Sequence, residues 1–312
     1  MLVQVLSEAF LIGVLAATVR TAIPVLLAAL GEVYSESSGV INIGLEGQML
    51  VGCLAGFLAA FYANSVWAAI AFSALAGGAI AFLLAVMTIT LRANQVVTGV
   101  TVNLLCLGLT TFVYRALFGV SLVAPSIPTM HEVVLPVLSQ IPIIGPVLFQ
   151  QKPSVYVAVL MAFLLYFVFY KTTVGLQVRA VGENPTAGET MGVNIIRTRY
   201  LCVVFAGVMA GLAGAILSVG EIGGFTYNMS AGRGFMALAI VIFGRWNPLL
   251  VLVASLFFGV ADSLQLSLQA LGLKLPSELF LSVPYLLTII IVAVTSTRSR
   301  APATLGVAYV KE

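Results

Sequence analysis

Runs of about 20 mostly apolar residues, each long enough to cross a lipid bilayer, recur along the whole chain. We place them at 9–31, 42–62, 66–91, 96–118, 154–170, 200–220, 248–266 and 279–297. A shorter apolar run at 234–244 suits a half-span or a tilted helix. Backbone groups inside hydrocarbon must hydrogen-bond within the protein, and a helix satisfies them within one segment. The sequence therefore predicts an all-α, polytopic transmembrane helix bundle of about 8–10 spans, broken or half-spans included.

The composition excludes a water-soluble fold. Hydrophobic residues make up 61% of the 312 residues and charged residues only 8%, against roughly 25% charged in soluble domains. No linker rich in Pro, Gly or Ser and no block of charge divides the chain, so residues 1–312 are expected to form a single transmembrane domain. The first basic residue is Arg20, so the N-terminus lacks the basic region of a secretory signal, and residues 3–19 are expected to be retained.

Residue types that carry catalysis or bind metals are scarce and scattered. Cys53, Cys106 and Cys202 each lie inside an apolar run, far from one another, which predicts packing residues and neither a metal site nor a disulfide. His131, the only histidine, is expected in a surface loop. The chain also lacks the patterns Gly-x-x-x-x-Gly-Lys-Ser/Thr, Gly-x-Ser-x-Gly and His-Glu-x-x-His. We therefore expect no enzyme, no cofactor and no metal; if ATP drives this protein, another subunit binds it.

Lysine and arginine in the short loops predict the orientation, because cytoplasmic loops are enriched in them. If the connection 171–200 and the C-terminal tail both face the cytoplasm, nine of the fourteen basic residues lie inside: Lys171, Arg179, Arg197, Arg199, Arg298, Arg300, Lys311, Arg92 and Arg245. Those assigned to the outside are Arg115, Lys152, Arg233 and Lys274. Arg20 stays unassigned. The connection 119–153 then becomes an extracytoplasmic loop, and its proline-rich, apolar character predicts a packed cap.

The connection 171–200, "KTTVGLQVRAVGENPTAGETMGVNIIRTRY", is the longest hydrophilic stretch assigned to the inner side. Asn184 and Pro185 form an N-cap and first-turn pair, and Gly192 ends the short helix that they begin. Glu183 and Glu189 are expected near the start of this helix. From the helix signals alone, two interpretations stay open: a helix that docks into a groove on another protein, or an ordinary solvated connection.

The residues "RAVGENPTAGETMGVN" resemble the coupling-helix segment of ATP-binding-cassette importer permeases, in the group that includes ribose, branched-chain amino acid and nucleoside permeases. The family pattern falls on Arg179, Ala180, Gly182, Asn184, Pro185, Ala187, Gly192 and Val193. In that family the segment sits in a cleft of a cytoplasmic ATPase and passes its closing motion to the membrane bundle. The resemblance thus implies ATPase-coupling residues: Arg179, Gly182, Glu183, Asn184, Pro185, Ala187, Met191 and Gly192.

A second stretch, "GEVYSESSGVINIGLEGQMLVG" at 31–52, also resembles this family. It is most similar to the branch that works with basic-membrane-lipoprotein-type receptors and imports nucleosides. The resemblance implies three protein partners: a cytoplasmic ATPase, a second related permease subunit in a heterodimer, and an extracytoplasmic substrate-binding lipoprotein. It also implies a bacterial cytoplasmic membrane location with the C-terminus in the cytoplasm. Nothing in the sequence implies a nucleic-acid partner.

Polar side chains inside the apolar runs are the candidates for the translocation path, because they are costly in lipid and are a functional hypothesis by default. They are Asn42, Glu46, Gln48, Asn103 and Asp262. Glycines at 39, 44 and 47 allow a break or a close helix approach next to the first three. Two interpretations stay open for Asn42 and Glu46: they meet a polar solute, or they cap helix ends and brace the bundle.

A Gly-rich polar interruption recurs at 220–235, "GEIGGFTYNMSAGRGF", before the short apolar run. Paired interruptions in two halves of a transporter point to a central pathway. Glu221 and Arg233 are expected to pair with each other at the outer surface.

Three function classes are compared. The first is the permease subunit of an ATP-driven nucleoside importer, with ribose or another small polar solute as the alternative substrate. The second is a secondary carrier in which Glu46, Glu221 and Asp262 bind a coupling ion, and in that case the capped loop has no purpose. The third, a membrane enzyme, lacks any nucleophile, metal or paired-carboxylate motif. The first class is the prediction.

Overall fold

The computed structural model of the chain describes residues 8–119, 125–134, 136, 139, 141–270 and 301–310. The apolar run expected at 279–297 lies outside these residues, as do the basic residues Lys274, Arg298, Arg300 and Lys311.

Seven helices in the described part are long and apolar enough to cross a membrane, and each coincides with an expected run. They are α2 (Glu8–Ser37), α3 (Leu45–Ala63), α4 (Val66–Ala85), α5 (Gln95–Phe118), α7 (Pro153–Lys171), α10 (Ile195–Ala215) and α12 (Pro248–Ala270). The first of them continues beyond residue 31 to Ser37 with Pro24 in its interior. The expected all-α class is therefore confirmed, and the chain is a multi-pass membrane protein.

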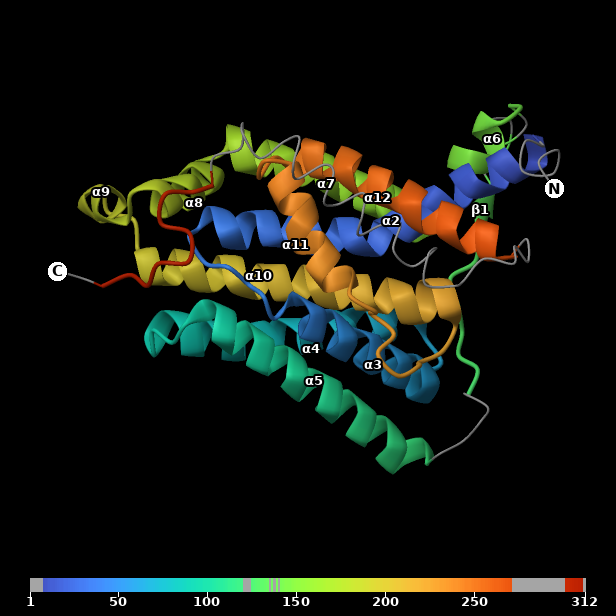
Figure 1. Ribbon diagram of the computed structural model, residues 1–312, viewed down its shortest axis with the longest axis horizontal. Helices are drawn as coiled ribbons and strands as arrows, with labels where there is room; N and C mark the ends of the chain where they lie inside the picture. The colour runs from blue at the N-terminus through green and yellow to red at the C-terminus, as the bar shows by residue number, and fades with distance from the viewer. Residues whose placement is uncertain are drawn as a thin grey trace.

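α10 is the central helix, and α2, α3 and α4 pack around it (Figure 1). Its contact with α4 depends on small residues. A Cβ at Gly211 would lie 2.1 Å from the carbonyl oxygen of Ser73, and one at Gly77 would lie 2.3 Å from that of Gly207. Helices in lipid associate through such close backbone approach, because burying apolar surface gives no net gain there. The core is thus built on backbone-to-backbone packing.

Irregular helix segments occur at membrane depth. α4 continues into a π-helical segment at Val86–Thr90, and α10 continues into another at Ile216–Ile222. α11 (Arg233–Phe243) is the short apolar helix expected at 234–244, with 11 residues. Such irregular backbone is stable in a membrane only where other parts of the protein bury it or where it lines a water-filled cavity.

The connections 119–153 and 171–200 lie at opposite ends of the bundle (Figure 1). At one end are α8 (Thr173–Glu183) and α9 (Pro185–Thr190), beside residues 301–310. At the other end are α6 (Ile144–Leu148) and the antiparallel strands β1 (Val133–Val134) and β2 (Gln150–Gln151), in which Val133 pairs with Gln151. This arrangement is what the distribution of basic residues predicts for 119–153 and 171–200.

The described part of 119–153 forms a cap that contacts α2 and the π-helical end of α10, although many of its residues are exposed. Gln151 is fully buried and its amide donates to the carbonyl oxygen of Val147 at 2.8 Å. Arg20, which the charge pattern leaves unassigned, forms an ion pair with Glu132 at 3.0 Å and so belongs to the cap end of the bundle.

The expected pair of Glu221 and Arg233 is wrong. Glu221 lies 3.9 Å from Lys152 at the cap, because the π-helical end of α10 carries it there. The Arg233 guanidinium instead donates to the carbonyl oxygens of Met229 and Ser230 at 3.4 and 3.5 Å, since its side chain folds back over the turn before α11.

α5 covers one side of the bundle (Figure 1). Many of its large apolar side chains are exposed on the outward side. Leu104 is 65% exposed and Phe112 is 70% exposed. A face of this kind is stable only against lipid or against another membrane protein.

Candidate functional site

The backbone breaks between α2 and α3, within the stretch 38–44 that the sequence marks as polar. Gly39 has a φ of 93°, a conformation open to glycine at little cost. Asn42 and Gln48 then face each other, and their amides exchange two hydrogen bonds of 2.9 Å each. The carboxylate of Glu32 accepts from the backbone N–H of Asn42 at 2.9 Å. Fully buried side chains therefore satisfy one another's hydrogen bonds across the break.

Glu46 connects this break to the second polar interruption. Its Oε1 accepts from the Ser230 hydroxyl at 2.6 Å and from the Gly232 N–H at 2.8 Å, and its Oε2 accepts from the Gly234 N–H at 2.7 Å. The last two donors lie at the N-terminus of α11, where unpaired N–H groups and the helix dipole favour a negative charge. A Cβ at Gly234 would lie 2.5 Å from the backbone of Glu46, so this approach requires glycine.

Asn103 on α5 joins the same cluster. Its Nδ2 donates to the carbonyl oxygen of Ile43 and its Oδ1 accepts from the N–H of Gly47, both at 2.8 Å. At the first residue of α5, the Gln95 side chain accepts from the N–H of Ile41 at 2.8 Å. α5 is thereby pinned to the break by two amide side chains.

Of the five predicted path residues, the structure brings Asn42, Glu46, Gln48 and Asn103 together around the break. Among the described residues, Asp262 forms no hydrogen bond with these four; it is half-buried on α12 and within electrostatic range of Arg233 at the start of α11. Next to it, the Ser263 hydroxyl lies 3.0 Å from that of Thr18 on α2, so this part of α12 braces α2.

The sequence analysis missed two buried carboxylates, Glu32 and Glu36, which lie one helical turn apart on α2 and are 0% and 4% exposed. The Trp246 indole donates to Oε2 of Glu36 at 2.6 Å. Oε2 of Glu32 is buried and has no hydrogen-bond partner among the described residues. Two glutamates at i and i+4, directly after the apolar run that ends at residue 31, are the signal that could have identified them.

The hydrophilic connection 171–200 contains two helices where the sequence analysis expected one. Asn184 begins α9 as predicted, and its Oδ1 accepts from the Ala187 N–H at 3.1 Å. Gly192, with a φ of 83°, follows the end of α9. Glu183, expected at the start of this helix, is instead the last residue of α8, and Glu189 lies near the end of α9.

The predicted coupling residues divide into two groups by exposure. Ala187 and Met191 are exposed on α9, with Met191 at 84%, and are available to a partner. Gly182 is buried against the bundle, and the Arg179 guanidinium lies over the Tyr170 ring at 5.2 Å. A contact surface and an internal attachment therefore occupy the same short segment.

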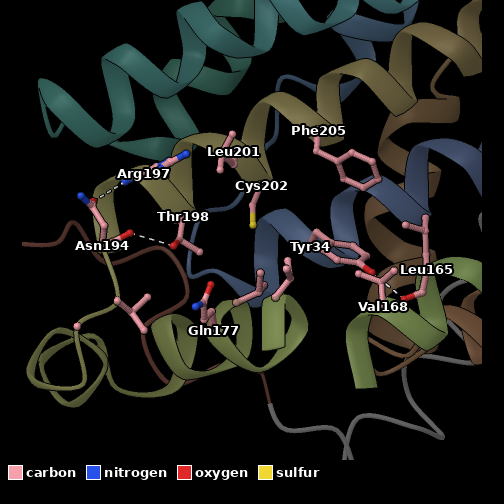
Figure 2. A pocket seen from close by; sticks show the side chains of 14 residues that line it. Tyr34, Leu165, Val168, Gln177, Asn194, Arg197, Thr198, Leu201, Cys202 and Phe205 are labelled. Carbon is pink, nitrogen blue, oxygen red and sulfur yellow. Dashed lines mark hydrogen bonds between the residues drawn. The ribbon is translucent and has the colours of Figure 1, made fainter. Parts of the chain in front are cut away.

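A cavity of about 570 Å³ lies between α8 and the start of α10. Figure 2 shows Gln177 on α8 facing it from one side, Asn194 and Thr198 from the other, and Tyr34 at the α2 wall. The Tyr34 hydroxyl donates to the carbonyl oxygen of Leu165 at 2.7 Å. The cavity leaves this length of α8 loosely packed against α10.

The structure is a multi-pass bundle with a buried polar break at its centre. The short helix α11 faces that break, and a capped helical loop lies at one end of the bundle. Together these features define a membrane permease subunit. The family described as branched-chain amino acid transport system / permease component matches residues 14–292, and the chain belongs to this family.

Several proteins named as transporter permeases are similar to this chain over most of their length. The guanosine ABC transporter permease protein NupQ of Bacillus subtilis is 36% identical, covering 99% of this chain and 98% of NupQ. The nucleoside ABC transporter permease protein NupC of Lactococcus lactis is 35% identical, covering 92% and 93%. The putative glucose ABC transporter permease protein TsgC13 of Haloferax volcanii is 39% identical, covering 85% and 80%. A solved inward-facing metal-chelate type ABC transporter is similar at 15% identity with a TM-score of 0.44, covering 89% of this chain and 85% of that one.

Proposed function

We propose that this chain is the membrane-spanning permease subunit of an ATP-driven importer of nucleosides in a bacterial cytoplasmic membrane. The observation that carries the proposal is similarity, over nearly the whole chain, to permease proteins named for guanosine and for nucleosides. The motif at 31–52 supports the same branch of the family, and it builds the buried break described above.

In this proposal α9 docks into a cytoplasmic ATP-binding-cassette ATPase, which places the C-terminus in the cytoplasm. The exposed Ala187 and Met191 contact the ATPase, and Asn184 and Pro185 fix the start of the helix. The chain itself is no enzyme, because hydrolysis takes place in that partner. The cap made by 119–153 then faces outward, toward a substrate-binding lipoprotein.

A second, related permease subunit completes the pathway. The apolar outward face of α5 is suited to a membrane-embedded partner or to lipid, and α5 also carries Asn103 at the break. We expect a heterodimer, in which each bundle contributes one wall.

Glu46 acts in this proposal as a brace for α11, with no direct contact to substrate. Three donors already occupy its two oxygens, and the residue is 7% exposed. A neutral nucleoside gains little from a carboxylate whose two oxygens already accept three hydrogen bonds. Movement of the break during the transport cycle would shift the N-terminus of α11 with it.

The test is uptake into proteoliposomes that contain the chain with its ATPase, second permease and receptor. Labelled guanosine is expected to accumulate only when ATP and the receptor are both present. Labelled glucose and ribose serve as competitors, because TsgC13 is named as a putative glucose permease. Accumulation of glucose without guanosine would assign the alternative substrate class. Gradient-driven uptake by this chain alone would refute the ATP-driven mechanism.

A further inference from the structure

Residues 301–310, which we call the C-terminal strap, lie beside α8 and the start of α10 (red in Figure 1). The strap has no regular helix or strand, yet it hydrogen-bonds to three separate parts of the chain. These are the helices α8 and α9, the break after α2, and Arg199 in α10.

The strap holds the two helices of the 171–200 connection. The N–H and the hydroxyl of Thr304 both donate to the carbonyl oxygen of Gly182, at 2.9 and 2.7 Å. The Tyr309 hydroxyl donates to the carboxylate of Glu189 on α9. Gly182 itself lies against α2, since a Cβ there would be 2.1 Å from the carbonyl oxygen of Ser37. The last turn of α8 is thus clamped between the strap and the end of α2.

The strap also holds the break. The N–H of Gly306 donates to the carbonyl oxygen of Gly39 at 3.1 Å. A Cβ at Gly39 would lie within 3 Å of both Arg199 and Thr304, so these two residues pack closely against the break and leave no room for a side chain there.

Arg199 locks these contacts together. It is 2% exposed, although the sequence places it among the basic residues of a cytoplasmic connection. Its Nε donates to the carbonyl oxygen of Ser38 at 3.1 Å, and its Nη1 donates to that of Val307 at 3.0 Å. Its Nη2 donates to the Thr304 hydroxyl at 3.4 Å. One guanidinium therefore bridges the break and the strap, as its planar fork of donors allows.

The packing of α8 is looser on the side that faces α10. The cavity of about 570 Å³ separates the middle of α8 from α10 (Figure 2). Direct packing across the cavity cannot transmit a small movement of α8, because rigid transmission needs close-packed atoms. The clamp at Gly182 is a tight attachment to α2 and the strap, and the other is at Gly175, where a Cβ would lie 2.1 Å from the carbonyl oxygen of Phe169 on α7.

We propose that the C-terminal strap and Arg199 are the transmission element that carries movement of α8 and α9 to the break between α2 and α3, and through Glu46 to α11. The proposal rests on the proposed function, since α9 must first receive movement from an ATPase. Thr304 and Arg199 are positioning residues in it and touch no substrate.

The first test replaces Thr304→Val, which keeps the shape of the side chain and removes its hydroxyl bonds to Gly182 and Arg199. Thr198→Val is the matched control. Thr198 directly precedes Arg199, and the substitution removes a 2.9 Å hydrogen bond from its hydroxyl to the carbonyl oxygen of Asn194. Both are measured in the reconstituted full complex as guanosine imported per ATP hydrolysed. We expect the ratio to fall about tenfold for Thr304→Val, which corresponds to about 1.4 kcal/mol, and to stay within about twofold for Thr198→Val. ATP hydrolysis itself should persist in both.

A wild-type ratio in Thr304→Val would overturn the transmission role. If that variant does not assemble, hydrogen exchange in the wild-type complex decides. The amides of Thr304 and Gly306 should stay protected in both the ATP-free and the ATP-trapped state, because the strap moves as one piece with its partners. Loss of protection in either state would contradict the proposal. Failure of the proposed function is seen separately, as a wild-type complex without ATP-dependent uptake.

Discussion

Replacing Glu46→Gln removes the charge that binds α11 to the start of α3 while keeping the size of the side chain. Hydrogen bonds to a charged group contribute about 1.5–3 kcal/mol and neutral ones about 0.5–1.5 kcal/mol. The bonds from Ser230 and Gly232 would become neutral, at a cost of about 1 kcal/mol each. The N–H of Gly234 would face an amide NH₂ and lose its acceptor, at a cost of about 1–3 kcal/mol. The expected destabilisation is about 3–5 kcal/mol in total.

The assay is the free energy of unfolding in bicelles, measured by steric trapping. Glu132→Gln is the control, because it removes a carboxylate from a solvent-exposed ion pair. In that pair the Glu132 side chain is 47% exposed and the Arg20 side chain 33%. An exposed pair contributes about 0–1 kcal/mol. If Glu46→Gln costs no more than Glu132→Gln and instead weakens nucleoside uptake, Glu46 binds substrate and the brace is refuted.

Two further substitutions test contacts at the end of α2. Gly182→Ala places a Cβ 2.1 Å from a backbone carbonyl oxygen of α2 and should force α8 outward by about 1 Å, costing about 1–3 kcal/mol and lowering coupled ATP hydrolysis. Gly188→Ala, where the nearest atom is at 3.4 Å, should leave both unchanged; equal effects would contradict the clamp. Trp246→Phe removes the donor to Glu36 and should cost about 1.5–3 kcal/mol in the unfolding assay. Trp67→Phe, at a side chain 79% exposed, should cost far less, and equal costs would refute the role of that hydrogen bond.

The helices were predictable because hydropathy is a local property. Each described membrane-length helix coincides with an apolar run, and the cap at Asn184 and Pro185 follows from residues within one turn of each other. Local signals also located both polar interruptions, at 39–50 and 220–235.

What the interruptions do was beyond local signals. Glu46 and Gly234 are 188 positions apart, and only the folded bundle shows that Glu46 caps α11, the helix with Gly234 in its first turn. Arg199 was counted among the basic residues of a cytoplasmic connection, because its burial depends on the strap more than 100 positions later. For the same reason Glu221 was paired with Arg233, although the fold places it beside Lys152.

The second helix in 171–200 was missed for a different reason. The apolar residues Val174, Val178 and Val181 recur at helical spacing across α8, but the family motif drew attention to the residues after Arg179. Val178 and Val181 are buried as the spacing predicts, whereas Val174 is 55% exposed.

The central claim is that α9 is held by a separate ATPase, and cysteine cross-linking tests it most directly. Met191→Cys places a thiol at a side chain 84% exposed on the coupling end. Tyr227→Cys, at a side chain 66% exposed toward the cap end, is the matched control. With a short bifunctional reagent in the assembled transporter, the cysteine at 191 should cross-link to the ATPase and the one at 227 should not. A cross-link to the ATPase from 227, or none from 191, would contradict the account.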